Sequence, residues 1–154
     1  LYFEKASVEH GSDFGLPQAV IDAHQETLEG GAASALKILR AGGRIGLGGD
    51  YGFAWSPHGT YARELTFFVE HVGFTPMEAI TCATKTGAEI MGRGDELGTI
   101  EPGKLADLLI VDGDVLGDIS ILENRENFIA VLQSGRLKAG QLAPRHEAAI
   151  RDVG

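Results

Sequence analysis

A short apolar segment bordered by glycine pairs constrains the fold more than any other feature of the sequence. It runs from Arg44 to Gly48, carries Ile45 and Leu47, and leads directly to Asp50. Glycines favour tight turns, so the chain is expected to bend sharply at both ends of the segment. Short apolar runs between turn signals are typical of buried strands. We therefore predict a buried strand over Arg44 to Gly48, with Asp50 at its carboxyl end.

Helical patterns precede this strand. Residues 17–28 read as a helix with Pro17 in its first turn, and Gly30-Gly31 are expected to break it. A second, amphipathic helix is expected before Gly42-Gly43, because apolar residues recur there at i, i+3, i+4 and i+7: Ala32, Ala35, Leu36 and Leu39. A helix, a glycine turn, a strand and a polar loop follow one another in this order in α/β units.

The sequence predicts two further helices after the Asp50 loop. An apolar stripe indicates a helix from Ala62 to Val72. The run Thr75-Pro76-Met77-Glu78 is typical of a helix start, because Thr75 can cap the helix and Glu78 can complete a capping box. This second helix is expected to end at Gly92.

A small β region is predicted after these helices. Strands are expected at 97–100, 105–111 and 128–133, and Ser134-Gly135 reads as a two-residue hairpin turn. The chain is therefore expected to divide into three parts: an α/β part (1–92), a β part (93–140) and a polar tail (141–154) that frays or forms a short helix.

Charge and cysteine content exclude several classes of partner and site. Lys and Arg number 13 against 22 Asp and Glu, and the formal charge of −9 argues against binding to nucleic acid. No apolar run reaches the ~18 residues of a membrane span. Cys82 is the only cysteine, which excludes an internal disulfide and a Cys-based zinc cluster, and we expect it to be buried.

Asp50 is the strongest single candidate for chemistry. In α/β folds, ligands and catalytic groups gather at the carboxyl ends of strands, which is where the predicted strand places Asp50. A carboxylate there can bind a divalent cation and can take a proton from metal-bound water. The alternative is that Asp50 only accepts hydrogen bonds from turn amides. The glycines around it do not fit a phosphate-binding loop, since neither the G-x-G-x-x-G spacing nor a Gly-Lys-Ser/Thr ending is present.

The histidines show no metal-binding pattern among themselves. There are five, and no pair has the His-x-His or His-Glu-x-x-His spacing. His58 differs from the others by its position, in the loop that follows Asp50 and near Trp55 and Tyr61. Loops often carry functional residues, although a single loop histidine can equally well be a solvated side chain.

Taken together, four stretches of the chain resemble the C-terminal part of the amidohydrolase superfamily, in its imidazolonepropionase-like and prolidase-like branch. The stretches are Ile45–Asp50, Pro57–Leu65, Phe74–Ile80 with Ala83-Thr84, and the most specific one, Leu97–Val111, which reads Leu-Gly-Thr-Ile-Glu-Pro-Gly-Lys-Leu-Ala-Asp-Leu-Leu-Ile-Val. The resemblance extends over roughly residues 1–140.

The resemblance implies a fold and a site. The family fold is a metal-dependent (β/α)8 TIM barrel with a small β-sandwich built from both chain ends. By resemblance, Arg44 to Gly48 would be the eighth barrel strand. Asp50 would ligate a divalent metal, expected to be zinc with one or two ions in the complete enzyme, and would shuttle a proton from water to the leaving amine. Tyr51 and His58 would line the substrate mouth, and residues 97–139 would belong to the sandwich.

The chain also departs from the family pattern. It has no His-x-His of the first strand, no lysine of the fourth strand, and no counterpart of the histidines after the fifth and sixth strands. His10-Gly11 resembles the sixth-strand motif only superficially, because His10 lies just 40 residues before Asp50. A full barrel needs ~250 residues, so we expect this chain to be a C-terminal portion that pairs with the missing N-terminal part or with a second copy.

Two hypotheses about function follow. The first is a metal-dependent amidohydrolase that cleaves an amide or peptide C–N bond in a small-molecule substrate, either a dipeptide or an N-acyl amino acid, with Asp50 as metal ligand and general base. The second is a truncated, non-catalytic homologue that serves as a binding or assembly module, because one plausible ligand does not make a metal site. A soluble protein is expected, with the cytoplasm as the favoured location.

Overall fold

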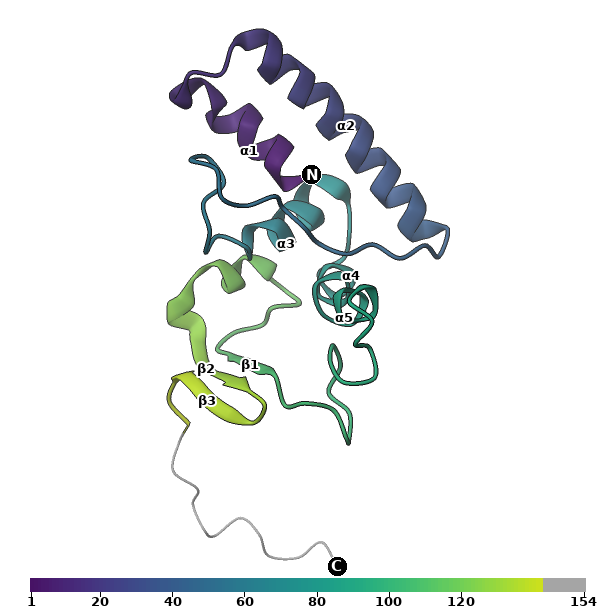
Figure 1. Cartoon of the computed structure of the whole chain (residues 1–154), viewed down its shortest axis with the longest axis vertical. Coiled ribbons are helices and arrows are strands. Elements are labelled where there is room, and N and C mark those ends of the chain that lie inside the picture. The colour runs from purple at the N-terminus through teal and green to yellow at the C-terminus, as the bar shows by residue number, and fades with distance from the viewer. Residues whose placement is uncertain (143–154) are drawn as a thin grey trace, which may run out of the picture.

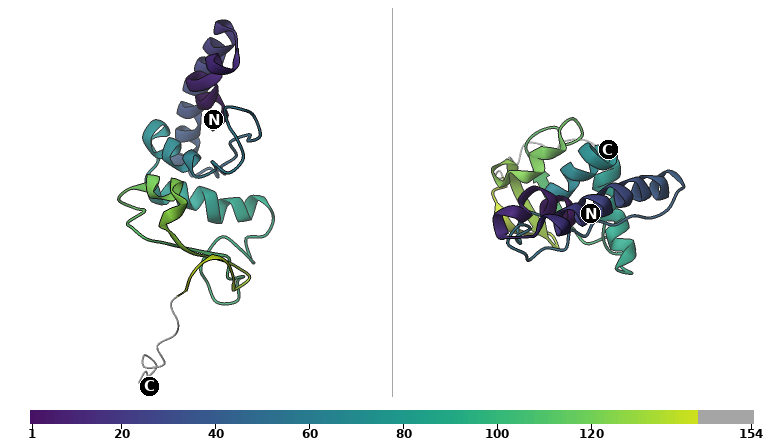
Figure 2. Two further views of the ribbon diagram at one scale, coloured as in Figure 1. Left: turned by 90° about the vertical axis from the view of Figure 1, so that its left-hand side faces the viewer. Right: turned by 90° about the horizontal axis from the view of Figure 1, so that it is seen from above.

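The computed structural model describes residues 1–142 as a series of layers along one long axis. A short and a long helix lie side by side at one end, further short helices occupy the middle, and a three-stranded sheet lies at the other end (Figures 1 and 2). Most of the predicted tail falls on residues 143–154, outside the described residues. None of the helices within residues 1–142 combines the length and the apolar character needed to cross a membrane.

The helices account for most of the first ninety residues. Helix α1 (Tyr2–His10) continues into a 3-10 turn (Gly11–Phe14) and is followed by the long helix α2 (Gln18–Arg40). The next helical segments come in pairs in which an α-helix joins a π-helical turn. Their bounds are α3 (Arg63–Phe67) with Phe68–Val72, and α4 (Pro76–Thr81) with Cys82–Thr86, which leads into α5 (Gly87–Ile90).

Helix α2 does not break at Gly30-Gly31, so that part of the prediction is wrong. A helical glycine costs up to about 1 kcal/mol relative to alanine, and packing of an amphipathic face can outweigh that cost. Leu28, Ala32 and Leu36 of α2 pack against the hydrophobic core. A Cβ at residue 31 would lie 2.3 Å from Cδ2 of Leu1, so a glycine here lets the amino end of the chain lie close to α2.

The core forms around the segment from Arg63 to Val72, which is helical as predicted. Phe67, Phe68 and Val72 are buried there and pack with Tyr2 of α1. Cys82 joins the same cluster and is buried, as the sequence predicts. The segment therefore connects α1 and α2 with the remainder of the chain.

The predicted capping box at Thr75 is confirmed. The backbone amide of Glu78 donates to Oγ1 of Thr75 at 3.2 Å, and the amide of Thr75 donates to Oε2 of Glu78 at 2.8 Å. Pro76 occupies the first turn, where a missing amide hydrogen costs nothing.

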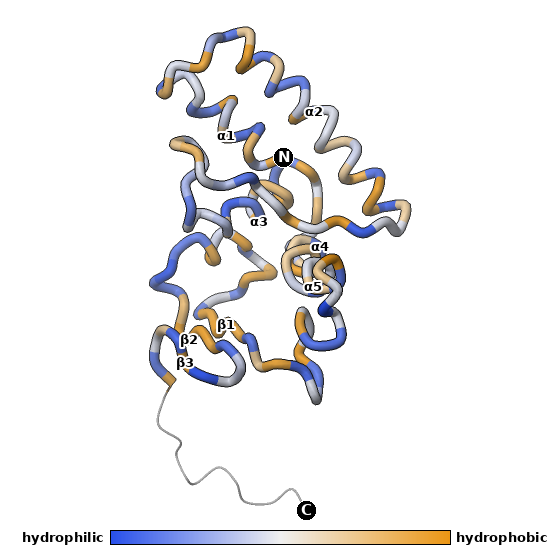
Figure 3. The backbone as a smooth tube through the Cα atoms, in the orientation of Figure 1, coloured by the Kyte–Doolittle hydropathy of each residue, from blue (hydrophilic) through white to orange (hydrophobic). Residues whose placement is uncertain are grey.

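The sheet is antiparallel and has the order β1-β2-β3, with β1 at Leu108–Val111, β2 at Phe128–Gln133 and β3 at Arg136–Gly140. Apolar residues predominate in β1 and β2 (Figure 3). Gln133 pairs with Arg136 across a turn in which Ser134 and Gly135 have φ of +49° and +73°. Positive φ at both central residues is the type I′ geometry of tight hairpins, so the predicted turn is confirmed.

Two predicted strands are absent. Arg44 to Gly48 lie in a segment without regular structure, because no strand among residues 1–142 pairs with them. Residues 97–99 form a bend instead of a strand, and the φ of +91° at Gly98 is incompatible with a strand. Lys104 ties this turn of the chain by donating to the carbonyl oxygen of Gly94. The complete barrel, the composite sandwich and the domain boundaries stay predictions.

The tight packing of Gly98 gives a test of this turn. A Cβ at Gly98 would lie 2.7 Å from Cβ of Ala88 and 2.9 Å from Cα of Lys85, whereas a Cβ at Gly103, which has φ of +92°, would meet nothing within 4 Å. Both alanine variants should lose about 1 kcal/mol to backbone strain. Gly98→Ala should lose a further ~1–3 kcal/mol to overpacking. Urea unfolding measures both losses, and equal losses would contradict the packing of Gly98 described here.

Candidate functional site

The loop that carries Asp50 has an unusual backbone. Asp50 is exposed and has φ of +51°, in the left-handed region that aspartate tolerates better than most residues. The preceding residue, Gly49, is buried, and a Cβ there would lie 2.5 Å from Cε2 of Tyr51. The aromatic ring of Tyr51 therefore folds back over Gly49, and the turn presents the side chain of Asp50 outward.

A cavity of about 450 Å³ lies beside this loop. Its polar side chains come from Asp50, Tyr51, Tyr61 and Glu64, and its apolar lining includes Leu47, Leu65 and Cys82. The loop after Gly48, the start of α3 and the turn after α4 all contribute to its wall. A mostly apolar hollow with a few polar groups is the usual form of a small-molecule site.

Tyr51 is held on three sides. Its ring stacks on Tyr2 with centroids 5.6 Å apart and meets Tyr61 edge-on at 4.7 Å, and its hydroxyl donates to the carbonyl oxygen of Tyr61 at 3.3 Å. Burial raises the pKa of the Tyr51 hydroxyl, and the Glu64 carboxylate nearby adds to this shift, so the hydroxyl stays protonated. Tyr51 lies in the cavity with Asp50, and its role in contacting substrate stays a prediction.

His58 is exposed and does not line the cavity itself. Its Nδ1 lies 3.1 Å from the hydroxyl oxygen of Tyr61, which does line the cavity. The structure therefore brings Asp50 and Tyr51 together and connects His58 to the cavity through the hydroxyl of Tyr61. Contact between His58 and a substrate stays a prediction.

Glu64 is the residue that the sequence reasoning missed. Its side chain is only 4% exposed, and its Oε1 accepts a hydrogen bond at 3.0 Å from the amide of Gly48. Burial raises the pKa of the Glu64 carboxyl, and the hydrogen bond from Gly48 partly opposes the shift. The sequence did contain an indication that Glu64 is buried. Glu64 lies three and four positions before Phe67 and Phe68, so the three residues share one helix face, and both phenylalanines are buried.

Ser56 is a second buried polar residue next to the loop. It is completely buried, and its Oγ donates to the carbonyl oxygen of Asp50 at 3.3 Å. The amide of Gly52 in turn donates to the carbonyl oxygen of Ser56 at 2.9 Å. Ser56 therefore closes the loop that begins at Asp50, through hydrogen bonds of its side chain and its backbone.

The described residues do not by themselves form a metal centre. Within residues 1–142, no three His, Cys, Asp or Glu side chains are grouped closely enough to hold an ion. Asp50 offers one carboxylate, and His10, at the end of α1, lines a different cavity with Glu9 and Arg63. A zinc site needs three or four protein ligands, so Asp50 could be only one member of a site.

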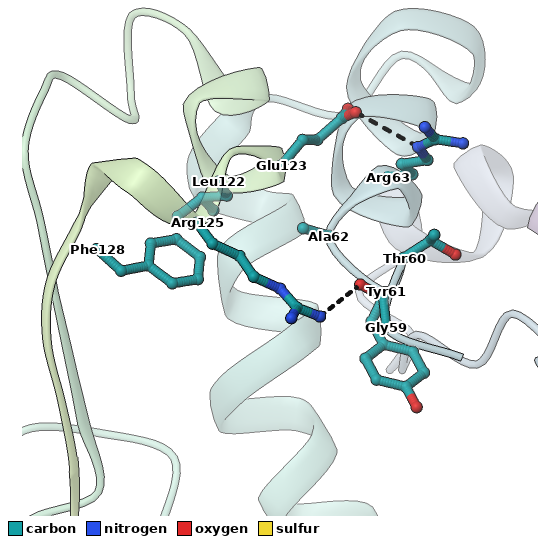
Figure 4. Close-up of a pocket in the computed structure, with 9 residues that line it drawn as sticks. All are labelled: Gly59, Thr60, Tyr61, Ala62, Arg63, Leu122, Glu123, Arg125 and Phe128. Atoms are coloured by element: carbon teal, nitrogen blue, oxygen red, sulfur yellow. Dashed lines mark hydrogen bonds and ion pairs between the residues drawn. The ribbon is translucent and has the colours of Figure 1, made fainter. Parts of the chain in front are cut away.

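Figure 4 shows the residues that line a second cavity, of about 350 Å³, next to the first. Tyr61 and Ala62 line both cavities. On its other side, Nη2 of Arg125 donates to the carbonyl oxygen of Gly59 at 3.3 Å, and Arg63 forms an ion pair with Glu123 (Figure 4). These contacts tie the segment that carries Tyr61 to the turns that precede β2.

Comparison with known proteins assigns the family. The model of the Amidohydrolase family matches residues 7–138, and the chain belongs to this family. An imidazolonepropionase from Geobacillus sp. (strain WCH70) is 32% identical over 113 residues, which are 72% of this chain and 27% of that protein. An ochratoxinase from Aspergillus niger is 32% identical over 124 residues, or 80% of this chain and 24% of that protein.

A solved structure shows the same relationship in three dimensions. The crystal structure of a putative prolidase from Bifidobacterium longum has a TM-score of 0.78 and 30% identity, over 88% of this chain and 32% of that one. The chain therefore spans about a quarter of the length of these curated relatives and about a third of this structure. The resemblance inferred from the sequence is confirmed.

The buried Glu64 carboxyl predicts a pH-dependent stability. Because its pKa is higher in the folded than in the unfolded state, the fold loses stability as pH rises through that raised pKa. Glu64→Gln removes the ionisable group. The free energy of unfolding of the variant minus that of wild type should therefore be largest at neutral pH and should decrease toward about pH 4.

Chemical unfolding across this pH range measures the effect, and Glu26→Gln, at an exposed position, is the matched control. The control should follow wild type throughout. A constant difference between Glu64→Gln and wild type from acid to neutral pH would show that the carboxyl of Glu64 is not perturbed in the fold.

Proposed function

We propose that the chain is the C-terminal part of an amidohydrolase that cleaves an amide or peptide C–N bond in a dipeptide or an N-acyl amino acid. Membership of the amidohydrolase family and relatives named imidazolonepropionase, ochratoxinase and prolidase support the reaction class. The observation that carries the proposal is the exposed carboxylate of Asp50, at the wall of a cavity large enough for a small substrate.

Asp50 is proposed as the group that moves the proton. Its carboxylate would accept a proton from the attacking water and return it to the nitrogen of the leaving amine as the C–N bond breaks. A divalent metal, expected to be zinc, would make that water a stronger nucleophile in the complete protein. The described residues contribute only Asp50 to such a site, so the other ligands would have to come from outside them.

Tyr51 and His58 are proposed to contact the substrate. Tyr51 has the better-supported position, because it lines the cavity together with Asp50. Its hydroxyl donates to the carbonyl oxygen of Tyr61 and its ring packs against Tyr2 and Tyr61, so a substrate would contact only the part of Tyr51 that borders the cavity. His58 would reach a substrate only at the rim of the cavity, beside Tyr61.

A second candidate function is a non-catalytic binding or assembly module. One observation favours it, namely that no metal-binding group of three side chains exists within residues 1–142. Metal analysis of the complete protein distinguishes the two functions. About one or two divalent ions per chain would support the hydrolase, whereas a correctly folded protein without bound metal would support the module.

Substitution of Asp50 tests the proposed chemistry. Asp50→Asn keeps a residue that tolerates the left-handed backbone but removes the proton acceptor. Hydrolysis by the complete protein should fall at least about 10²-fold in kcat. Asp95→Asn, at an exposed turn away from the cavity, is the control and should retain wild-type turnover. Turnover by Asp50→Asn within a few-fold of wild type would contradict the proposed role.

Substitution of His58 tests the proposed substrate contact. His58→Ala should raise KM while leaving kcat close to wild type, because a rim contact binds ground state and transition state alike. His10→Ala, at the exposed end of α1, is the control. Unchanged steady-state constants for His58→Ala would remove His58 from the substrate site.

A further inference from the structure

The loop before α3 is held by two polar side chains that are themselves buried. Glu64 is 4% exposed, and Ser56 has no exposed surface. A buried polar group is costly unless it is hydrogen-bonded, and both side chains direct their hydrogen bonds to the short segment around Asp50. Neither residue is needed for the proton transfer proposed above.

Glu64 holds the segment on its amino side. Its Oε1 accepts from the amide of Gly48, two residues before Asp50, at 3.0 Å. Glu64 belongs to α3, whose last residue, Phe67, is 2% exposed, and Phe68 at the start of the following π-helical turn is 3% exposed within the core. The hydrogen bond therefore fixes the entry to the loop to one of the most firmly packed segments of the chain.

Ser56 holds the segment on its carboxyl side. Its Oγ donates to the carbonyl oxygen of Asp50 at 3.3 Å, and its own carbonyl accepts from the amide of Gly52 at 2.9 Å. The amide of Ser56 donates to the carbonyl oxygen of Phe53 at 3.1 Å. One side chain and two backbone groups thus close the turn directly after Asp50.

The backbone between these two hydrogen bonds has a sparsely populated conformation. Asp50 has φ of +51°, and Gly49 before it lies under the ring of Tyr51. Sparsely populated conformations of this kind persist where the surrounding structure determines them, and they cluster at functional sites. A strand ladder does not fix the segment, because Gly48 and Asp50 belong to no strand among residues 1–142.

We propose that Glu64 and Ser56 are positioning residues that fix the carboxylate of Asp50 at the cavity wall by holding the backbone on either side of it. The proposal rests on the proposed function of Asp50. It assigns neither residue a contact with substrate.

The first experiment compares Glu64→Ala with Glu64→Gln in the complete protein. Alanine leaves the amide of Gly48 without its acceptor, whereas the amide oxygen of glutamine can still accept that hydrogen bond. Misplacement of a catalytic group by about 1 Å can cost about 10²-fold in rate. Glu64→Ala should therefore lose up to about that much in kcat with little change in KM, and Glu64→Gln should recover most of the loss.

The second experiment does not depend on activity. Hydrogen exchange of ¹⁵N-glycine-labelled protein follows the amide of Gly48 directly. Exchange at Gly48 should accelerate in Glu64→Ala and stay close to wild type in Glu64→Gln, while the amide of Gly52, which donates to Ser56, should be unaffected in both.

A matched pair of serines tests the hydrogen bond between Ser56 and the carbonyl oxygen of Asp50. Ser56 and Ser7 are both fully buried, and each donates to a backbone carbonyl, that of Asp50 and that of Phe3 respectively. Ser56→Ala should lower kcat without raising KM, whereas Ser7→Ala should leave both constants unchanged. This pair keeps the proposal testable if Glu64→Ala does not fold.

Three results would overturn the proposal. They are unchanged exchange at Gly48 in Glu64→Ala, equal losses of kcat in Glu64→Gln and Glu64→Ala, and equal effects of Ser56→Ala and Ser7→Ala. If wild-type protein hydrolyses no amide, the proposed function fails, and exchange at Gly48 alone then decides whether Glu64 holds the loop.

Discussion

The burial of the helical segment from Arg63 to Val72 is the constraint on which the rest of the structure depends. Phe67, Phe68 and Val72 on this segment supply the centre of the core, against which α1 and α2 pack. Apolar burial is the largest favourable contribution to folding, so the position of this segment is strongly determined. Glu64 lies on the same segment and accepts a hydrogen bond from the amide of Gly48, which ties the loop of Asp50 to this firmly packed segment.

The candidate site therefore depends on a polar interaction that is anchored in an apolar core. A buried carboxylate is unfavourable in isolation, yet here it accepts a hydrogen bond from the amide of Gly48, which pairs with no strand within residues 1–142. This hydrogen bond holds the backbone just before Asp50, and the side chain of Asp50 remains exposed at the cavity. This division between a buried support and an exposed reactive group fits the amidohydrolase chemistry proposed for the protein.

Features with local causes could be predicted from the sequence. The capping box at Thr75 and the hairpin turn at Ser134-Gly135 depend on residues no more than three positions apart, and both are present. Features that depend on distant partners could not. The predicted strand from Arg44 to Gly48 needs neighbouring strands, and α2 continues through its two glycines because of packing against other segments.

The same division applies to the site. Asp50 could be singled out because its glycine neighbours and its family resemblance both lie in the sequence around it. The interaction of Glu64 with Gly48 joins residues 16 positions apart, and no local pattern specifies it. The link from His58 to the cavity likewise depends on where Tyr61 places its hydroxyl, which only the fold determines.

The proposed chemistry requires the carboxylate of Asp50 to act at the scissile amide. A crystal structure of the complete protein with a non-hydrolysable amide analogue tests it most directly. In that structure, a carboxylate oxygen of Asp50 should lie within about 2.6–3.2 Å of the amide nitrogen or of the water aligned to attack the amide. An analogue bound elsewhere, or bound in the cavity with Asp50 beyond the reach of one bridging water, would rule out this role of Asp50.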